Sequence, residues 1–490
     1  MAATAIRLKV GSTTLTFDES GTDGKLIKYD PVMPREKILR HQRQIADGDD
    51  LVAFSYANPK EEAKILLEGT YTQIQTIFQK IVKIGQQARR NAEFGATLED
   101  QVFLEVLPET ESTYWRSKIF SITPHIENDA LDLHIDNQKI VFVLQFIREY
   151  FFEHTTKQTL FASNTAIERT QSGVTVYNSN DAVSSVRYNW LDILNQDIDG
   201  DLPAPVRMSL ERTYNDVDRT THFWYGLDYR SVGPTTVPLR ISSNLNIAIG
   251  ASNLPGSPDN TLYENGQYSH NTFTNDTSQI VAYFSLTQAQ IDLFGGNFYR
   301  VLIRMPGGAQ HADFRLEAEY DNGGSTPLWT SGLLPVANTT TEIFDFGVFQ
   351  MPPFLPDRSD FGLYPVNFRI YAKRPAGSSG TWDFDIDWIQ FLPTDSWGIV
   401  RDAGFGWGTD DIAVDDAIDD LQYVDFDDPN GGAFPSLLRY GTGIWVTPHI
   451  DESAGDVHRI WYIWEDEDEL LDVEAYLKVT LVYRPRRLFL

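Results

Sequence analysis

Alternation of apolar and polar residues defines the stretch from 101 to 153. In LDLHID, Leu131, Leu133 and Ile135 alternate with polar residues, which is the period of a strand with one buried face and one wet face. In IVFVLQFI (140–147) apolar residues occupy both faces, so this strand is expected in the middle of a sheet. The stretch therefore predicts three or four consecutive strands of a scaffold sheet, separated by turns.

One segment has helical spacing instead. Between Thr72 and Asn91 apolar residues recur every three or four positions, at Ile74, Ile77, Phe78, Ile81, Ile84 and Ala88. Thr70 or Thr72 is a suitable N-cap for this helix. With a β-hairpin expected over residues 5–30, residues 1–160 predict a β-sandwich or split barrel that carries one packed α-helix.

The segment from 31 to 60 combines a basic cluster with an acidic turn. Arg35, Lys37, Arg40 and Arg43 precede the run of aspartates between 47 and 50. In a monomer such a segment is expected to be a surface loop. In a ring of subunits it is instead an arm that meets the acidic face of a neighbour, and the sequence leaves both interpretations open.

The remaining chain predicts a mainly β protein. Residues 161–204 are rich in Asn, Asp and Ser and are expected to be a linker. Residues 205–393 show short strand-like runs with polar, Gly-rich connections, which predict a jelly-roll β-sandwich. Residues 394–490 contain further strand-like runs, and we expect this C-terminal β segment to pack on the N-terminal domain or to form a third domain.

Composition and charge narrow the function classes. The net charge of −29 disfavours a phosphate-binding surface, so no specific nucleic-acid binding is expected. The absence of cysteine excludes disulfides, thiolate zinc sites and cysteine nucleophiles. No apolar run is long enough to cross a bilayer or to serve as a secretory signal. We therefore expect no membrane insertion and assembly in the cytoplasm.

Motifs of common enzymes are missing from the sequence. It contains no GxSxG elbow, no HExxH zinc helix and no GxxxxGK[ST] phosphate loop. A carboxylate pair such as Asp383 and Asp385 resembles the pair of a glycoside hydrolase. In a chain with 69 acidic residues, however, a solvated strand face explains the pair better. We expect that the protein is not an enzyme.

Several aromatic residues are candidates for ligand binding. A Trp or Tyr that lies flat at the rim of a jelly roll stacks on the apolar face of a sugar. The candidates for such platforms are Trp224, Tyr225, Trp329 and Trp382. The alternative for each of them is a position in the core, which aromatic residues of a β-sandwich commonly occupy.

The order of these elements resembles a known family. A helix, VFLEV, a strand that closes in REYFFE, a GDLPAPV linker into a jelly roll that closes on DIDWIQFLPTD, and a YRPR terminus follow one another. This layout is similar to the tail virion proteins of long-tailed bacteriophages, and most of all to the distal tail protein. The resemblance implies a homo-oligomeric ring, expected to be a hexamer, that contacts other phage tail proteins in the virion.

The jelly roll by itself resembles galactose-binding-like and carbohydrate-binding modules. In that family an acidic residue of the closing strand often helps to hold a structural calcium ion. Asp387, in DIDWIQF, is the position that matches, and Asp385 is a second candidate. The resemblance thus implies a possible structural calcium and a possible contact with host cell-surface glycans.

Two hypotheses about the whole protein remain beside the tail ring. A head decoration or tail fibre component differs from a ring in its number of copies per particle, and a free carbohydrate-binding protein differs in binding glycans on its own. If the chain does form a DNA conduit, acidic walls would repel phosphates and let DNA slide. The segments Asp410–Asp428 and Glu465–Glu469 are the candidates for such walls.

Overall fold

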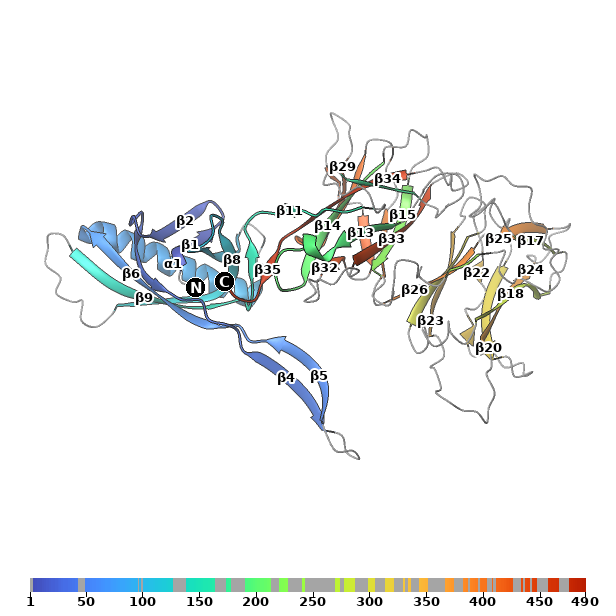
Figure 1. Cartoon of the computed structure of the whole chain (residues 1–490), viewed down its shortest axis with the longest axis horizontal. Coiled ribbons are helices and arrows are strands. Elements are labelled where there is room, and N and C mark those ends of the chain that lie inside the picture. The colour runs from blue at the N-terminus through green and yellow to red at the C-terminus, as the bar shows by residue number, and fades with distance from the viewer. Residues whose placement is uncertain are drawn as a thin grey trace.

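The structure is a computed structural model, and it shows three β-rich bodies in a row (Figure 1). The described residues are 3–42, 49–95, 97, 100–126, 138–163, 173–177, 190–212, 220–227, 240–242, 269–273, 277–286, 298–304, 313–320, 329–330, 334–335, 343–350, 366–373, 382–386, 388–394, 397–402, 408, 411–425, 433–434, 437–440, 443–446, 457–466 and 476–490. The predicted mainly β fold class is confirmed. Among the described residues there is one α-helix.

The first body is a closed seven-stranded barrel. Its strands are β1 (Ala3–Val10), β2 (Thr13–Asp18), β3 (Gly24–Tyr29), β6 (Lys60–Gly69), β7 (Val102–Pro108), β8 (Trp115–Ile126) and β9 (Gln138–Arg148). They pair in the order β8-β7-β1-β2-β3-β6-β9, and β8 also pairs with β9, which closes the sheet. Only β2 and β3 run parallel. Closure removes the free sheet edges that an open sandwich would have.

Helix α1 (Tyr71–Phe94) packs against β8, as its apolar stripe predicts. A capping box begins the helix. In it the side chain of Thr70 accepts from the backbone N–H of Gln73, and the side chain of Gln73 accepts from the backbone N–H of Thr70. Ile81 and Ala88 belong to the same core as the barrel interior. Gly85 allows the closest approach, since a Cβ there would lie 2.8 Å from the backbone oxygen of Ile122.

A two-stranded ribbon leaves the barrel between β3 and β6 (Figure 1). It consists of β4 (Glu36–Gln42) and β5 (Asp49–Tyr56), which pair antiparallel with each other and with no other described strand. The N–H of Ala57 donates to the carbonyl of Arg35 at 2.8 Å and so continues the ribbon at its base. We call residues 36–56 the arm, and its contact with a neighbouring subunit stays a prediction beside the alternative of a surface excursion.

The second body is a β-sandwich, the middle sandwich. One sheet contains β11 (Gln158–Thr159), β12 (Val174–Tyr177), β14 (Ala204–Arg212), β28 (Ile412–Asp416), β29 (Leu421–Asp425), β30 (Ala433–Phe434), β32 (Trp445–Val446) and β34 (Tyr476–Tyr483). The other contains β13 (Trp190–Leu194), β15 (Thr220–Leu227), β27 (Trp397–Asp402), β31 (Leu437–Tyr440) and β33 (Val457–Asp466). Residues of both sheets share one buried core.

The third body, the outer sandwich, is inserted between β15 and β27. One sheet contains β16 (Arg240–Ser242), β19 (Phe298–Arg304), β23 (Ile343–Gln350) and β26 (Trp388–Pro393). The other contains β18 (Gln279–Leu286), β20 (Asp313–Tyr320), β21 (Trp329–Thr330), β22 (Leu334–Pro335) and β24 (Val366–Lys373), and β17 (Ser269–Phe273) pairs with β25 (Trp382–Ile386). Phe368 contacts Phe391 across the two sheets, with ring centroids 4.9 Å apart.

The strand pairing differs from the division of the chain that the sequence suggested. β14 and β15, expected within the jelly roll, belong to the middle sandwich, and so do β12 and β13 of the expected linker. Strands after residue 394 pair with β14 and β15, whereas only β35 (Arg486–Arg487) joins the barrel sheet, next to β10 (Phe152–His154). Segments that are distant in sequence thus complete one sandwich. The strand expected at 131–135 lies outside the described residues.

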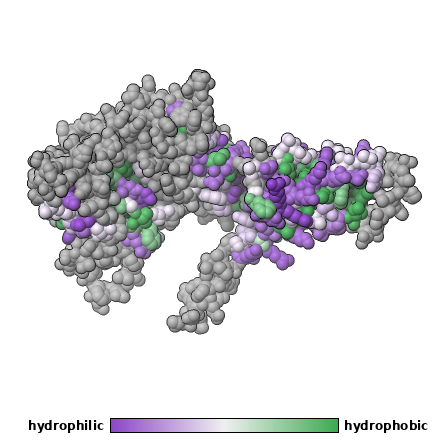
Figure 2. Space-filling model, turned by 180° about the vertical axis from the view of Figure 1, so that it is seen from behind, coloured by the Kyte–Doolittle hydropathy of each residue, from purple (hydrophilic) through white to green (hydrophobic). Residues whose placement is uncertain are grey.

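The barrel surface is mostly hydrophilic in the described part that Figure 2 shows, with smaller hydrophobic areas. Exposed large apolar residues of the barrel and its helix are Ile27, Tyr71, Phe94, Ile126 and Ile147. They are distributed over different elements, which is ordinary for a protein surface.

Candidate interaction site at the arm and the neck

A fully buried ion pair lies at the root of the arm. Arg148, the last residue of β9, donates from Nη2 to Oε1 of Glu61 at 2.8 Å, and neither side chain is exposed to solvent. Tyr29 donates from Oη to Oε2 of Glu61 at 2.6 Å. Burial, together with the negative charge of Glu61, raises the pKa of Tyr29 well above its ordinary value. The phenol therefore remains a hydrogen-bond donor at neutral pH.

The same two charges bind the backbone that enters the arm. The N–H of Val32 donates to Oε1 of Glu61 at 2.7 Å, and the carbonyl of Val32 accepts from Nη2 of Arg148 at 3.1 Å. The backbone N–H of Arg148 donates to the carbonyl of Pro59 at 3.2 Å, on the segment that leaves the arm. Arg148 is thus bonded to the chain on both sides of the arm. We call Tyr29, Glu61 and Arg148 the clamp.

Carboxylates and arginines concentrate where the barrel meets the middle sandwich. We call this junction, formed by residues 149–157, 199–202 and 484–488, the neck. Glu153 accepts a charge-assisted hydrogen bond from Nη2 of Arg116 at 2.6 Å and lies 3.4 Å from Nη1 of Arg484. The N–H of Leu488 donates to Oδ1 of Asp201 at 2.7 Å. These contacts join three separate chain segments.

Stacked side chains continue from the arm through the neck. Tyr56 at the end of β5 stacks on Tyr150, with ring centroids 5.6 Å apart, and Tyr150 meets Phe151 edge to face at 5.0 Å. The guanidinium of Arg486 lies 4.2 Å from the ring centroid of Phe151 and 5.3 Å from that of Trp445 in β32. Burial lowers the pKa of Arg486, although nearby carboxylates oppose this effect. The arm base is therefore connected to the middle sandwich by packed side chains.

The acidic segment after residue 410 is partly internal. Asp415 and Asp416 are buried, and the hydroxyl of Tyr225 donates to Asp415. Lys157 donates from Nζ to Asp416 at 2.9 Å and to Asp419 at 2.7 Å. Burial alone would lower the pKa of Lys157, but these hydrogen bonds raise it overall. Asp415 and Asp416 therefore belong to the interior of the sandwich, and the hypothesis that the segments Asp410–Asp428 and Glu465–Glu469 line a conduit stays a prediction.

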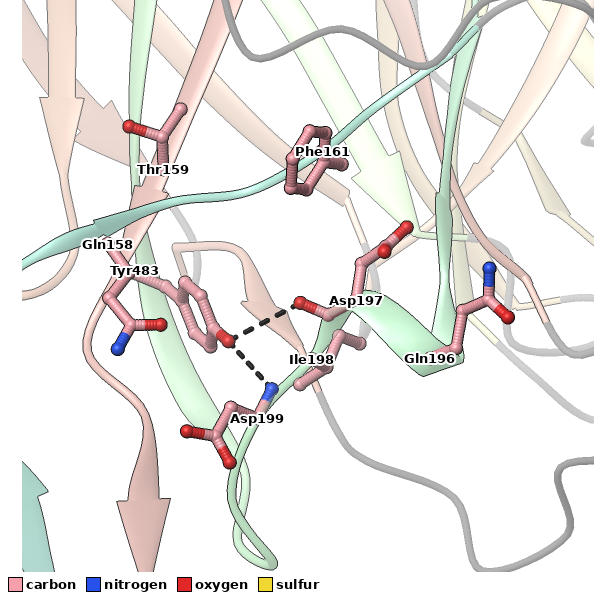
Figure 3. Close-up of a pocket in the computed structure, with 8 residues that line it drawn as sticks. All are labelled: Gln158, Thr159, Phe161, Gln196, Asp197, Ile198, Asp199 and Tyr483. Atoms are coloured by element: carbon pink, nitrogen blue, oxygen red, sulfur yellow. Dashed lines mark hydrogen bonds between the residues drawn. The ribbon is translucent and has the colours of Figure 1, made fainter. Parts of the chain in front are cut away.

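A shallow polar cavity of about 570 Å³ lies at one edge of the middle sandwich (Figure 3). Its lining is Gln158, Thr159, Phe161, Gln196, Asp197, Ile198, Asp199 and Tyr483. The N–H of Asp199 donates to Oη of Tyr483 at 2.7 Å, and the hydroxyl contacts the carbonyl of Asp197 at 3.4 Å. None of the described lining residues is basic, and they contain no nucleophile paired with a base.

The structure separates the predicted aromatic platforms. Trp224 and Tyr225 lie in β15 with 4% and 1% of their surface exposed, so the alternative of a core position applies to both. A buried ring offers no face for a sugar. Trp329 belongs to β21 and Trp382 to β25, both in the outer sandwich, but the orientation of their side chains lies outside the description. These four residues do not form one site.

The predicted calcium ligands are only partly described. Asp385 belongs to β25, where its backbone pairs with His270, and Asp387 lies outside the described residues. The described residues contain no group of three or more His, Asp or Glu that is arranged to hold a metal ion. In the same part of the chain, no helix is sufficiently long and apolar to cross a membrane.

Comparisons with known proteins give distant structural neighbours. No protein-family model matches the chain, and no curated protein matches its sequence. The chain aligns with a solved structure of the phage p2 baseplate in its activated conformation with Sr at 9% identity and a TM-score of 0.27, covering 46% of this chain and 72% of that chain. It aligns with the SPP1 Dit (gp 19.1) protein, a hub of the adsorption apparatus in phages that infect Gram-positive hosts, at 8% identity and a TM-score of 0.29, covering 98% of each chain. TM-scores this low establish no common fold, and the function has to follow from the residues of this chain.

The clamp was not predicted from the sequence, although two of its charged residues stand at positions where their strands are otherwise apolar. In KEEAKILLEG, Glu61 is in phase with Ala63, Ile65 and Leu67, which form the buried face of β6. Arg148 continues in the same way the buried series of Phe142, Leu144 and Phe146 in β9. A charged residue on the apolar phase of a strand indicates a buried partner of opposite charge.

Proposed function

We propose that this chain is a structural, non-enzymatic component of a bacteriophage tail, whose barrels assemble into a homo-oligomeric ring with the arm of one copy lying against the next. The observation that carries the proposal is the arm. Its two strands pair with each other, and among the described strands neither has another neighbour. It also projects away from the barrel rather than folding back on it (Figure 1).

An isolated two-stranded ribbon is at best marginally stable in water, because few of its side chains are buried. Both of its outer edges carry backbone donors and acceptors that a further strand can satisfy. A second copy of the chain can supply this partner. A contact between two different surfaces of identical subunits closes into a ring when the rotation between copies divides a full turn.

Charge supports the same arrangement. Arg35 and Lys37 are exposed at the base of the arm, whereas the chain as a whole has a net charge of −29. Residues 35–43 carry four basic residues and one acidic residue, so this strand of the arm is attracted to the other copies, whereas the aspartates at 47, 49 and 50 balance the charge of the arm as a whole. The partner that we propose for the arm is therefore an acidic surface of the neighbouring subunit.

Within the particle, we propose a distal-tail position, a ring of six copies, and contacts with other tail proteins, in keeping with the order of elements in the sequence. The outer sandwich lies at the end of the chain of bodies opposite the barrel (Figure 1). We propose that the ring displays the outer sandwich at the surface of the particle and that host glycans are the ligands of this sandwich. The binding of glycan at Trp329 and Trp382, and of calcium at Asp387, remain predictions.

The test is the native mass of the purified protein with and without the arm. In the armless variant an Asn-Gly turn replaces residues 36–56. A short turn can join the two ends because Arg35 and Ala57 already lie side by side, linked by a backbone hydrogen bond. We expect the unaltered chain to have a native mass that is a multiple of 55.6 kDa and the armless variant to be a folded monomer. A monomeric unaltered chain, or an armless variant that still assembles, would overturn the proposal.

A second pair of variants tests the charge argument. Arg35→Gln/Lys37→Gln removes two exposed positive charges at the arm base, and Lys9→Gln/Lys28→Gln removes two exposed charges from the barrel strands. We expect only the arm pair to weaken assembly, and the weakening should diminish as salt is added. Equal effects of the two pairs would contradict a specific role for the arm charges.

A further inference from the structure

We infer that Glu61 and Arg148 of the clamp fix the direction of the arm within a single subunit, so that the arm is already oriented for its neighbour before assembly. This inference rests on the proposed ring. It makes Glu61 and Arg148 positioning residues for association, in addition to parts of the barrel core.

The cost of burying the two charges argues against a role in stability alone. Replacing a buried ion pair with apolar residues of similar volume is often neutral or stabilising, because desolvation offsets the attraction between the charges. Glu61 and Arg148 are both fully buried, in a barrel whose other inward residues are mostly apolar. What the charged groups provide, and apolar groups would not, is a set of directed hydrogen bonds.

Those hydrogen bonds converge on one residue of the arm root. Val32 donates its N–H to Glu61 and offers its carbonyl to Arg148, so both polar groups of one peptide segment are bound by side chains of the barrel. Opposite polarity is essential to this arrangement, since a carboxylate accepts and a guanidinium donates. The position and the rotation of the chain at Val32 are therefore both fixed.

The return segment of the arm is bound by the same strand. The backbone N–H of Arg148 binds the carbonyl of Pro59, and Tyr56 stacks on Tyr150 two residues further along. A ribbon that is attached at both of its ends cannot swing as a single tether would. The end of β9 thus acts as a common anchor for the two strands of the arm.

Such preorganisation matters for assembly because ordering a flexible element at the moment of binding reduces affinity. A ring also demands that each contact have the same geometry, since small angular errors add up around the circle. An arm with a fixed direction satisfies both requirements. Loss of the clamp should consequently weaken ring formation without unfolding the barrel.

The experiment measures arm direction separately from assembly. Because the chain contains no cysteine, Thr13→Cys in β2 and Asp49→Cys at the start of β5 give two unique sites for spin labels. Labelled chains are diluted with unlabelled ones so that distances within one subunit dominate. The clamp is removed by Tyr29→Phe/Glu61→Leu/Arg148→Met, and Tyr29→Phe alone is the matched control that keeps both contacts to Val32.

We expect a narrow distance distribution in the unaltered chain and in the Tyr29→Phe control, and a broad one in the triple variant. The concentration needed for ring formation should rise about tenfold or more in the triple variant. A broad distribution in the unaltered chain, or an unchanged distribution in the folded triple variant, would overturn the inference. Failure of the unaltered chain to assemble while the distributions behave as expected would instead refute the ring alone.

A second variant covers the case in which the triple variant does not fold. Glu61→Arg/Arg148→Glu retains an ion pair but reverses its polarity, so that a guanidinium faces the N–H of Val32 and a carboxylate faces its carbonyl. If the clamp acts through Val32, this swapped pair should broaden the label distances as much as removal does. A narrow distribution with the swapped pair would show that the directed contacts do not set the direction of the arm.

Discussion

Trp224 and Tyr225 are adjacent in β15, and their side chains enter two different cores. Trp224 packs with Leu302 of the outer sandwich and Trp461 of β33 in a small cluster between the two sandwiches. Tyr225 points into the middle sandwich, where its hydroxyl donates to the buried carboxylate of Asp415. Alternation along a strand places neighbours on opposite faces of the sheet. Trp224 therefore contributes to the contact between the two sandwiches, whereas Tyr225 contributes to the core of the middle sandwich.

Replacement of Trp224 should loosen the outer sandwich from the middle one. A buried Trp that is truncated to Ala costs about 3–5 kcal/mol, because it leaves a cavity as well as losing burial. We expect Trp224→Ala to broaden the distribution of molecular dimensions in small-angle X-ray scattering while the barrel remains folded. Leu421→Ala in β29 is the control, since that residue is 48% exposed and lies outside the cluster. Equal broadening in both variants would contradict a coupling role for Trp224.

Removal of the Tyr225 hydroxyl should destabilise the middle sandwich. Tyr225→Phe keeps the ring but takes a donor from Asp415, which is 3% exposed. The loss of a hydrogen bond to a buried charge costs about 1.5–3 kcal/mol, and urea unfolding followed by tryptophan fluorescence measures it. Tyr423→Phe is the comparison, because its hydroxyl accepts from Arg207 in a less buried position. We expect that change to cost less than the change at Tyr225, and the reverse order would be evidence against the importance of the Asp415 contact.

Local patterns in the sequence predicted the elements better than their assembly. The stripe from Ile74 to Ala88 and the cap at Thr70 were sufficient for α1, since helix periodicity and capping act within a few residues. The middle sandwich could not be predicted in this way. β14 pairs with β34, more than 260 positions away, and no local pattern specifies a partner at such a distance.

Part of the candidate site could be predicted from the sequence. The basic residues between 35 and 43 left a surface loop and an arm open, and the backbone there forms a two-stranded ribbon, which neither interpretation specified. For Trp224 and Tyr225 composition was misleading, because an aromatic residue in a β-sandwich looks the same in sequence whether it faces solvent, a core or a domain interface. Glu61 and Arg148 could have been found by phase, as charged residues on the apolar face of two strands, but their pairing required the register of β6 with β9.

Tyr483 should make stability depend on alkaline pH. Burial raises its pKa from 10.0 to about 12, although the hydrogen bond from the N–H of Asp199 opposes the shift. In the unfolded chain the phenol ionises near pH 10, whereas in the folded chain it keeps its proton until about pH 12. Its contribution is thus fully present below pH 10 and is lost as the pH rises through the folded value.

The measurement compares the unaltered chain with Tyr483→Phe in urea unfolding at several pH values. Other buried tyrosines affect both proteins equally, so the difference between the two isolates this residue. We expect the advantage of the unaltered chain to be constant at neutral pH and to shrink between about pH 10 and 12. An advantage that stays constant over this range would show that the phenol does not titrate differently in the two states.

Gly85→Ala should destabilise the barrel, although Ala is the better helix former. In an exposed helix interior the change from Gly to Ala stabilises by about 1 kcal/mol. Here a Cβ would lie 2.8 Å from the backbone oxygen of Ile122, so α1 would have to move away from β8. We expect a net loss of about 1–3 kcal/mol, as for other overpacked sites. Lys83→Ala, two residues earlier in the helix, is the control for the effect of alanine itself, and thermal unfolding of both variants decides the sign. A more stable Gly85→Ala variant would mean that the helix does not approach β8 as closely as the structure shows.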